Sequence, residues 1–216
     1  MENNMEDIAR QLRKPMGSQG QEISQRMNDS NSNMVNKTID SLNIQLGQSI
    51  VEIGAGNGIT SRPVLETIGK HGKYIAIDYS KDMLKLVDKN LKGMGFYNFE
   101  IIHGDCTKID AELVKEPDGI FACNLLYFID DLTKFVQHVK SWLPSKAKMS
   151  FSVRSKETME QFPFTKFNFN IRTINDYIKE FNAAGVDVEI NVFNDEGKAI
   201  DGKIVKTDFY ILHAKL

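Results

Sequence analysis

The chain has 216 residues, of which 41% are hydrophobic and 26% are charged, and this composition is typical of a globular protein and not of a disordered one. The length suits one domain, with or without an appended segment. The formal net charge of −2 provides no basic field, which argues against nucleic acid or anionic lipid as a partner. Cys106 and Cys123 both lie beside apolar runs, so we expect no disulfide and a reducing compartment.

The first 48 residues differ from the rest because Asn, Gln and Ser are frequent, above all at 28–33. The N-terminus lacks the apolar core of a signal peptide, and the chain has no apolar run of about 18 residues, so we expect a cytoplasmic protein without a membrane span. Ile8 and Leu12 are four positions apart, which favours a docked helix. We therefore predict short helices joined by a loop at 15–20, with a partly disordered tail as the alternative.

From residue 49 onward, predicted strands and helices alternate along the chain. Apolar runs predict strands at 49–53, 73–78, near 99–103, near 118–123 and at 147–153. Apolar residues at helical spacing predict helices at about 58–69, from Ser80 to about 91, at about 131–142 and at about 173–184. Two β-rich runs follow, at 186–193 and 204–214, and the turn between them predicts an antiparallel pair.

This alternation indicates right-handed crossovers between parallel strands, with helices on both faces of the sheet. We therefore expect an α/β fold. Its sheet is Rossmann-like, mostly parallel and seven-stranded, with an antiparallel hairpin at the edge.

The most informative segment is the turn Glu52-Ile53-Gly54-Ala55-Gly56-Asn57-Gly58, which links a predicted strand to a predicted helix. Glycines at such a turn let the backbone approach a ligand closely. The dinucleotide fingerprint G-x-G-x-x-G would place its third glycine at Ile59. The spacing here is G-x-G-x-G, which frees the backbone at the turn for a bulky nucleoside in place of a pyrophosphate. No Gly-Lys-Ser/Thr follows, which excludes the Walker phosphate loop.

Two acids lie at the ends of predicted strands downstream of this turn. Asp78 ends the second strand, where a carboxylate can accept hydrogen bonds from both hydroxyls of a ribose. Asp105 follows the third strand in His103-Gly104-Asp105-Cys106, where an acid can accept a hydrogen bond from the exocyclic amine of adenine. Both positions are carboxyl ends of adjacent parallel strands, which is where open α/β sheets bind ligands.

In this order, the glycine turn, Asp78 and Gly104-Asp105 resemble three motifs of the class I S-adenosylmethionine-dependent methyltransferases, over about residues 49–153. The resemblance implies S-adenosyl-L-methionine as the cofactor and no metal. It also implies a methyltransferase domain at 49–216, preceded by a helical extension or lid at 1–48.

Two weaker similarities point to one branch of this family. Phe164–Phe169 and the helix after it resemble the small-molecule branch, near the quinone- and lipid-precursor (type 11) methyltransferases. Gly17–Gly20 with Arg26–Asn28 is similar to the helical lid of some bacterial members.

The resemblance gives the glycine turn a role at each position. Gly54, Gly56 and Gly58 would line the methionine and ribose parts of the cofactor, and Glu52 would steady the loop and the amino end. Tight packing of the turn is the alternative explanation for the glycines.

The resemblance also implies roles for the residues at the next two strand ends. Asp78 would bind the ribose hydroxyls, Tyr79 would lie against the adenine, and Met83 would contact the cofactor. Asp105 would bind the adenine amine, with Cys106 beside it as a small wall residue. Capping of the following helix or turn is the alternative for both acids.

Asn124 follows the fourth strand and would face the methyl group and the acceptor, although it could instead cap a turn. The amino-group DNA methyltransferases have two prolines after such an asparagine, whereas Leu125 and Leu126 follow here, so that assignment is rejected. Tyr127 is the best available polar group at the mouth of the site and the weak candidate for a catalytic residue.

We expect a methyl group to be moved by in-line displacement to a small-molecule acceptor at oxygen, nitrogen or carbon, with positioning worth roughly 7–11 kcal/mol. The aromatic residues Phe162, Phe164, Phe167 and Phe169 belong either to the core or to an apolar wall of the acceptor pocket. Three rival functions stay open: a non-catalytic module that binds the cofactor, an RNA methyltransferase on the same fold, and a nicotinamide oxidoreductase, against which Ile59 and Asp105 argue.

Overall fold

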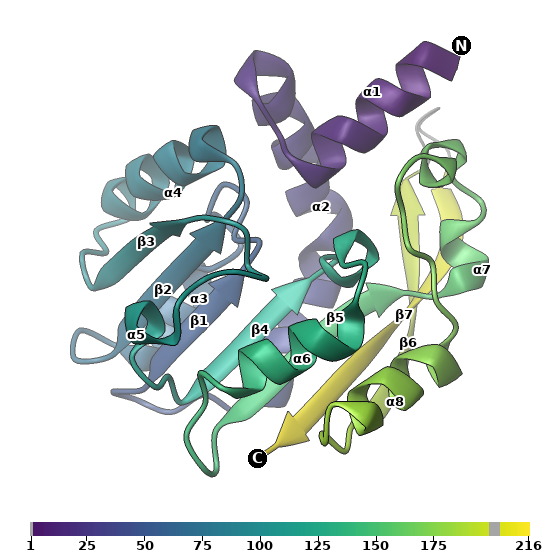
Figure 1. Cartoon of the computed structure of the whole chain (residues 1–216). Coiled ribbons are helices and arrows are strands. Elements are labelled where there is room, and N and C mark those ends of the chain that lie inside the picture. Colours follow the sequence, from purple (N-terminus) through teal and green to yellow (C-terminus); the bar gives the residue numbers. More distant parts are fainter. Residues whose placement is uncertain (1, 199–203) are drawn as a thin grey trace.

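A computed structural model of the chain describes residues 2–198 and 204–216. Its strands are β1 (Ser49–Ile53), β2 (Lys73–Asp78), β3 (Phe99–His103), β4 (Gly119–Cys123), β5 (Lys148–Arg154), β6 (Glu189–Lys198) and β7 (Ile204–Lys215). They form one sheet in the order β3-β2-β1-β4-β5-β7-β6 (Figure 1). The strands β1 to β5 are parallel, and β7 runs antiparallel to both β5 and β6. The predicted Rossmann-like sheet with an antiparallel edge hairpin is confirmed.

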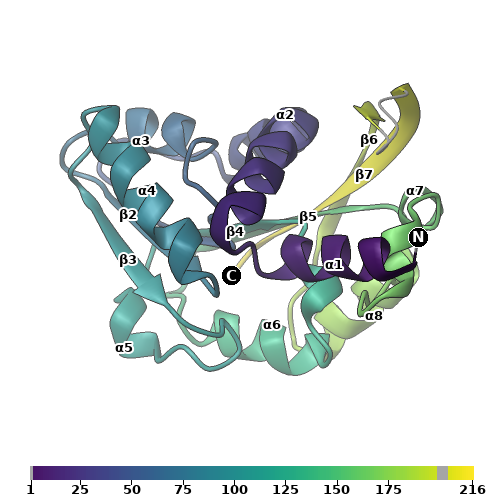
Figure 2. The same ribbon diagram turned by 90° about the horizontal axis from the view of Figure 1, so that it is seen from above.

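Helices cover both faces of this sheet, as predicted. The α-helices are α1 (Glu2–Arg13), α2 (Gly17–Leu42), α3 (Arg62–Ile68), α4 (Lys81–Gly93), α5 (Ala111–Val114), α6 (Leu132–Lys140), α7 (Lys156–Met159) and α8 (Ile174–Ala183). Short 3-10 helices lie at η1 (Leu126–Phe128) and η2 (Pro163–Lys166). Figure 2 shows α2, α3 and α4 on one face, and α5, α6 and α8 on the other. Within the described residues, the helices are too short or too polar to cross a membrane.

The register of the parallel strands brings the predicted site residues to one edge of the sheet. Ile53 at the end of β1 is paired with Ile77 of β2, and Asp78 is paired with His103 of β3. The residues that follow these pairs therefore leave the sheet side by side. The glycine turn, Asp78 and the Gly104-Asp105 segment are neighbours because the strands before them are in register.

Helix α2 differs from the prediction for the N-terminal residues. A loop at 15–20 and short helices were expected, but α2 begins at Gly17 and continues through the Asn- and Ser-rich stretch to Leu42. Its C-terminal part buries Met34, Val35 and Ile39 against the sheet. Each such burial contributes about 1.5–3 kcal/mol, which outweighs the weaker helix propensity of Asn and Ser. The alternative of a partly disordered tail is wrong for this helix.

Three predicted segments differ locally from the structure. The aromatic segment, residues 162–169, was expected to be partly extended, but the 3-10 helix η2 forms part of it. Strand β6 continues beyond residue 193 to Lys198, because Asn194 to Lys198 pair with β7. The rest of the predicted turn, residues 199–203, lies outside the described part of the chain. The first predicted helix starts later than expected, since α3 begins at Arg62, with Pro63 in its first turn as predicted.

Candidate functional site

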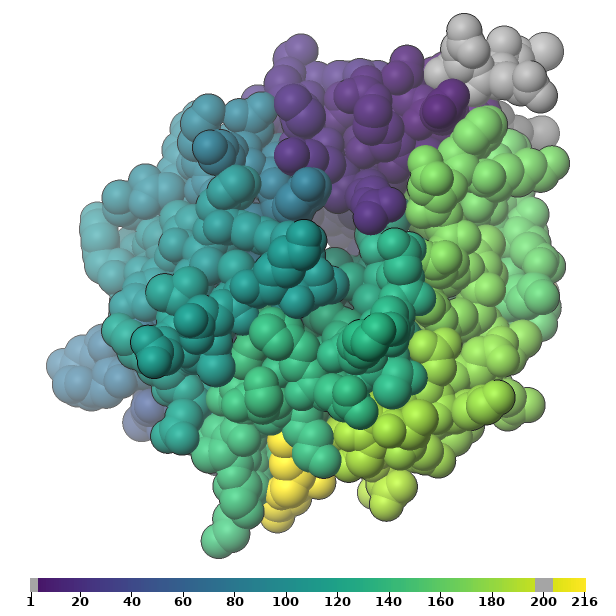
Figure 3. Space-filling model, viewed as in Figure 1, coloured from purple at the N-terminus to yellow at the C-terminus, as the bar shows by residue number. Residues whose placement is uncertain are grey.

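A cavity of about 340 Å³ lies at the carboxyl ends of the parallel strands. This volume is within the range of small-molecule sites. The sheet side of the cavity is formed by residues that follow β1, β2, β3 and β4, and the opposite side is formed by α1 and α2. In Figure 3 the surface is hollowed at this place, below the N-terminal helices drawn in purple.

The glycine turn forms the floor of the cavity. Gly54 and Gly56 have φ angles of 78° and 54°, in the left-handed region that favours glycine. The amide of Gly54 donates a hydrogen bond of 2.8 Å to the Ile77 carbonyl, which fixes the turn to the end of β2. A Cβ atom on Gly56 would meet no atom within 4 Å, so the backbone at this residue faces open space. The turn therefore presents bare backbone to a ligand at Gly56.

Gly58 does not line the cavity, although it was expected to. Its φ of 75° requires glycine, and a Cβ atom there would lie 3.2 Å from the Cα of Val87 in α4. The third glycine of the turn thus allows α4 to pack closely, which is the packing alternative.

Asp78 joins the glycine turn to the start of α4. Its Oδ2 accepts a hydrogen bond of 2.9 Å from the Gly56 amide, and its Oδ1 accepts one of 2.7 Å from the Ser80 amide. The side chain is buried at the cavity wall, and this burial raises the pKa of the carboxyl above its ordinary value, although the amide donors oppose the shift. The carboxylate therefore both caps a backbone turn and faces the cavity.

Glu52 lies beneath the turn in a buried network. Its Oε2 accepts hydrogen bonds from the Ser61 hydroxyl at 2.6 Å and from the Tyr74 hydroxyl at 2.5 Å. Burial raises the pKa of Glu52 to about 7 in spite of these two donors. The predicted steadying of the loop fits this network, which links β1, β2 and the residues before α3.

Residues after β3 and β2 complete the sheet side of the cavity. Asp105 lines it, while its Oδ1 accepts hydrogen bonds from the amide and hydroxyl of Thr107 at 3.0 and 2.7 Å, so it also caps a turn. Cys106 lines the same wall, and burial raises the pKa of its thiol to about 12, which suits a wall residue. The ring of Tyr79 is half exposed, and the Lys14 ammonium lies 4.1 Å from its centre.

Besides Gly58, two of the expected site residues lie elsewhere. Met83 is fully buried in α4 and does not line the cavity. Tyr127 was expected at the mouth, but its ring is buried behind the wall, where its hydroxyl accepts a hydrogen bond from the Arg154 amide and donates one to Asn124. Burial also raises the pKa of Tyr127 well above its ordinary value. Asn124 does line the cavity, with a φ of 54°.

The aromatic segment does not line the cavity but lies behind Phe128, which does. Phe128, which was not predicted, lines the cavity, and its ring centre is 4.8 Å from that of Phe169. Phe164 in turn contacts Phe169 and stacks on Phe162. None of the four predicted aromatic residues lines the cavity, and all four are half-buried. Of the four, only Phe169 packs against the main hydrophobic core, so neither interpretation describes the whole set.

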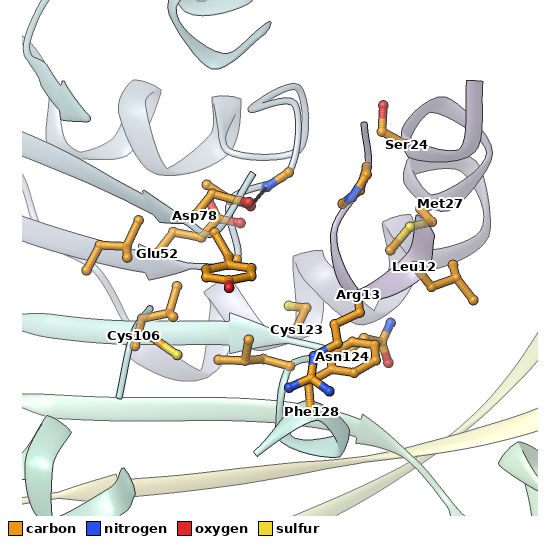
Figure 4. A pocket seen from close by; sticks show the side chains of 18 of the residues that line it. Leu12, Arg13, Ser24, Met27, Glu52, Asp78, Cys106, Cys123, Asn124 and Phe128 are labelled. Atoms are coloured by element: carbon orange, nitrogen blue, oxygen red, sulfur yellow. Dashed lines mark hydrogen bonds between the residues drawn. The ribbon is translucent and has the colours of Figure 1, made fainter. Parts of the chain in front are cut away.

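The side of the cavity opposite the strand ends, its roof, is formed by α1 and α2 and contributes many lining residues that the sequence did not single out. Asn57 of the glycine turn donates a hydrogen bond of 3.1 Å to Ser24 and accepts one of 3.0 Å from Asn28, so the turn is bonded to α2. The polar composition of the N-terminal residues was the available signal. Other lining residues that were not predicted are Leu12, Arg13, Asn31, Val35 and Ile129, whereas Leu125, which follows Asn124, was expected to face the acceptor and does line the cavity. Figure 4 shows Leu12, Ser24 and Met27 on the N-terminal helices, across the cavity from Asp78 and Cys106.

Among residues 2–198 and 204–216, no group of three or more His, Cys, Asp or Glu side chains is placed to hold a metal ion.

Comparison with known proteins identifies the domain that carries this site. Residues 50–146 match the sequence model of a family described as methyltransferase domain. A protein-L-isoaspartate O-methyltransferase of Methanococcus vannielii is 39% identical over 75 residues, which cover 35% of this chain and 36% of that protein. A demethylmenaquinone methyltransferase of Oceanobacillus iheyensis is 28% identical over 75 residues, or 35% of this chain and 32% of that one. The chain thus matches about a third of the length of these curated relatives.

A solved structure shows the same fold over nearly the whole chain. The S-adenosylmethionine-dependent methyltransferase of Aquifex aeolicus superposes with a TM-score of 0.66, at 17% identity, over 97% of both chains. Residues 50–146 thus match a methyltransferase domain, and the chain has the predicted fold, which it shares with this S-adenosylmethionine-dependent methyltransferase.

Replacing Asp78 by Ala is expected to weaken the binding of S-adenosylhomocysteine by about 1.5–3 kcal/mol, the scale of hydrogen bonds to a charged group. Calorimetric titration measures this change, and melting curves check that the variant is folded. Asp88→Ala, at an exposed ion pair with Lys92 on α4, is the matched control and should leave affinity unchanged. Equal affinity of Asp78→Ala and the wild type would rule out a role in ligand binding.

The raised pKa of Glu52 predicts how stability depends on pH. Between about pH 4.5 and pH 7 the unfolded chain loses this proton while the folded chain keeps it, so stability falls as pH rises through this window. The loss is at most about 3 kcal/mol. Denaturant unfolding at several pH values should show a shallower decline for Glu52→Gln than for the wild type, while Glu66→Gln, an exposed control, should follow the wild type. Parallel profiles for all three proteins would contradict the assignment.

Proposed function

We propose that the chain is an S-adenosylmethionine-dependent methyltransferase that acts on a small-molecule acceptor. The observation that carries this proposal is the direct hydrogen bond between Gly56 and Asp78 at the cavity wall. It places bare glycine backbone and a carboxylate side by side within a methyltransferase domain.

The residues around the cavity fit the cofactor. The open space at Gly56 admits a bulky ligand against the backbone, and the buried Asp78 carboxylate has lone pairs left for the ribose hydroxyls. Tyr79 offers an exposed ring for the adenine, and Asp105 is the acceptor for its amine. Gly54 and Asn124 are the nearest candidates for the methionine part and the reacting end.

When bound, S-adenosylmethionine supplies a methyl group activated by a sulfonium. The task of the protein is then to hold the acceptor in line and to exclude water. We assign the exclusion of water to the N-terminal helices, residues 1–48, which roof the cavity through Ser24 and Asn28 and so act as a lid.

The roofed cavity supports a small acceptor over an RNA, because α1 and α2 cover the strand ends that a polymer would have to reach. The two free cysteines agree with a reducing, cytoplasmic setting, which stays a prediction.

Incubation with methyl-tritiated S-adenosylmethionine tests the proposal against its rivals. We expect label in extracted small molecules and none in an added pool of total RNA, with Asp78→Ala inactive and Asp88→Ala active. Label in RNA would contradict the acceptor class. Cofactor binding with no transfer to any pool would favour the non-catalytic binding module.

A further inference from the structure

The charged residues that line the cavity are divided between its two sides. Glu52, Asp78 and Asp105 lie on the side of β1, β2 and β3. Arg13, at the end of α1, lies on the opposite side beside Phe128 and Asn124, apart from Asp78 and Glu52 (Figure 4). The cavity therefore has an acidic side and a side with a single cation.

The surroundings of Arg13 leave its guanidinium available. Its central carbon is 6.0 Å from the centre of the Phe128 ring. Within residues 2–198 and 204–216, the side chain of Arg13 makes no hydrogen bond or ion pair. Leu12, Met27 and Ile129 are apolar residues that line the same cavity, together with the uncharged Asn31 and Asn124. A guanidinium above an aromatic ring and an apolar wall is a recognition element for a planar anion.

The segment after Arg13 is fixed to the sheet, so this cation has a defined place. The Ser80 hydroxyl donates a hydrogen bond to the Pro15 carbonyl, and the Gly17 amide donates one of 3.0 Å to Asp82. The Lys14 ammonium lies over the Tyr79 ring in the same region. These contacts anchor the end of α1 at the junction of β2 and α4.

Given the proposed function, we propose that the acceptor is a molecule with an apolar body and one carboxylate, and that Arg13 binds this carboxylate. The guanidinium matches a carboxylate through two parallel hydrogen bonds. One cation balances one negative charge, whereas a dianion such as a phosphate monoester would keep an excess charge facing Asp78 and Asp105 across the cavity. Phe128 and Leu12 then contact the apolar body. Arg13 is in this view a residue that determines specificity.

Cys123 and Tyr127 are uncharged at neutral pH, and burial raises the pKa of both further. The pKa of the Cys123 thiol, which lines the same side, is raised to about 12. Tyr127 is held by the Arg154 backbone behind the wall. Arg13 is therefore the charged group that meets an acceptor on this side.

Binding of simple probes to the full chain saturated with S-adenosylhomocysteine tests this proposal. Phenylacetate carries a carboxylate where phenylacetamide carries a neutral amide of similar shape. Calorimetry or ligand-observed NMR measures the affinity of the protein for each. In the wild type the acid should bind about tenfold or more tightly than the amide, the scale of a hydrogen bond to a charged group. Arg13→Met should abolish this preference and keep the affinity for S-adenosylhomocysteine within about twofold. Arg10→Met, also exposed on α1, should behave as the wild type.

Equal binding of the acid and the amide to the wild type, including no binding of either, would overturn the proposal. Loss of S-adenosylhomocysteine affinity in Arg13→Met would overturn it too, because Arg13 would then hold the carboxylate of the cofactor. Failure of S-adenosylhomocysteine to bind the wild type would instead contradict the proposed function, and the preference for the acid can still be measured without it.

Discussion

The hydrogen bond from the Gly56 amide to the Asp78 carboxylate is the interaction on which the site depends. It links the turn after β1 to the end of β2, and the bond from Gly54 to the Ile77 carbonyl strengthens the same link. Parallel strands in register bring these ends together, but the strands alone would leave the glycine turn free to move. The carboxylate gives the turn one conformation, and the bare backbone then faces the cavity.

Helix α2 connects this floor to the rest of the molecule. Its C-terminal half is part of the core, where Met34 packs against β7, while its N-terminal half presents Ser24 and Asn28 to Asn57. Arg154 at the end of β5 donates hydrogen bonds of 2.9 and 3.2 Å to Ser30 and Asn31 between the two halves. The roof of the cavity is therefore attached to the sheet at both its centre and its end.

The sequence predicted the parts of the fold that local patterns determine. Buried parallel strands are short apolar runs, so β1 and β2 were placed at their observed ends, and the edge hairpin was recognised. A helical lid at 1–48 was expected from the resemblance, but the contacts that hold it were not, because burial of Met34 and pairing of Asn57 with α2 are contacts across the chain that no local pattern shows. Gly58 and Tyr127 were misplaced for the same reason: Val87 and Arg154, the residues that hold them, are distant in sequence.

If Asp78 and the glycine turn together hold the cofactor, a crystal structure with S-adenosylhomocysteine will show it. Both ribose hydroxyls are expected within hydrogen-bond distance of the Asp78 carboxylate, with the ligand against the backbone of Gly54 and Gly56. A ligand bound with its ribose away from Asp78, or outside the cavity, would refute this role of Asp78.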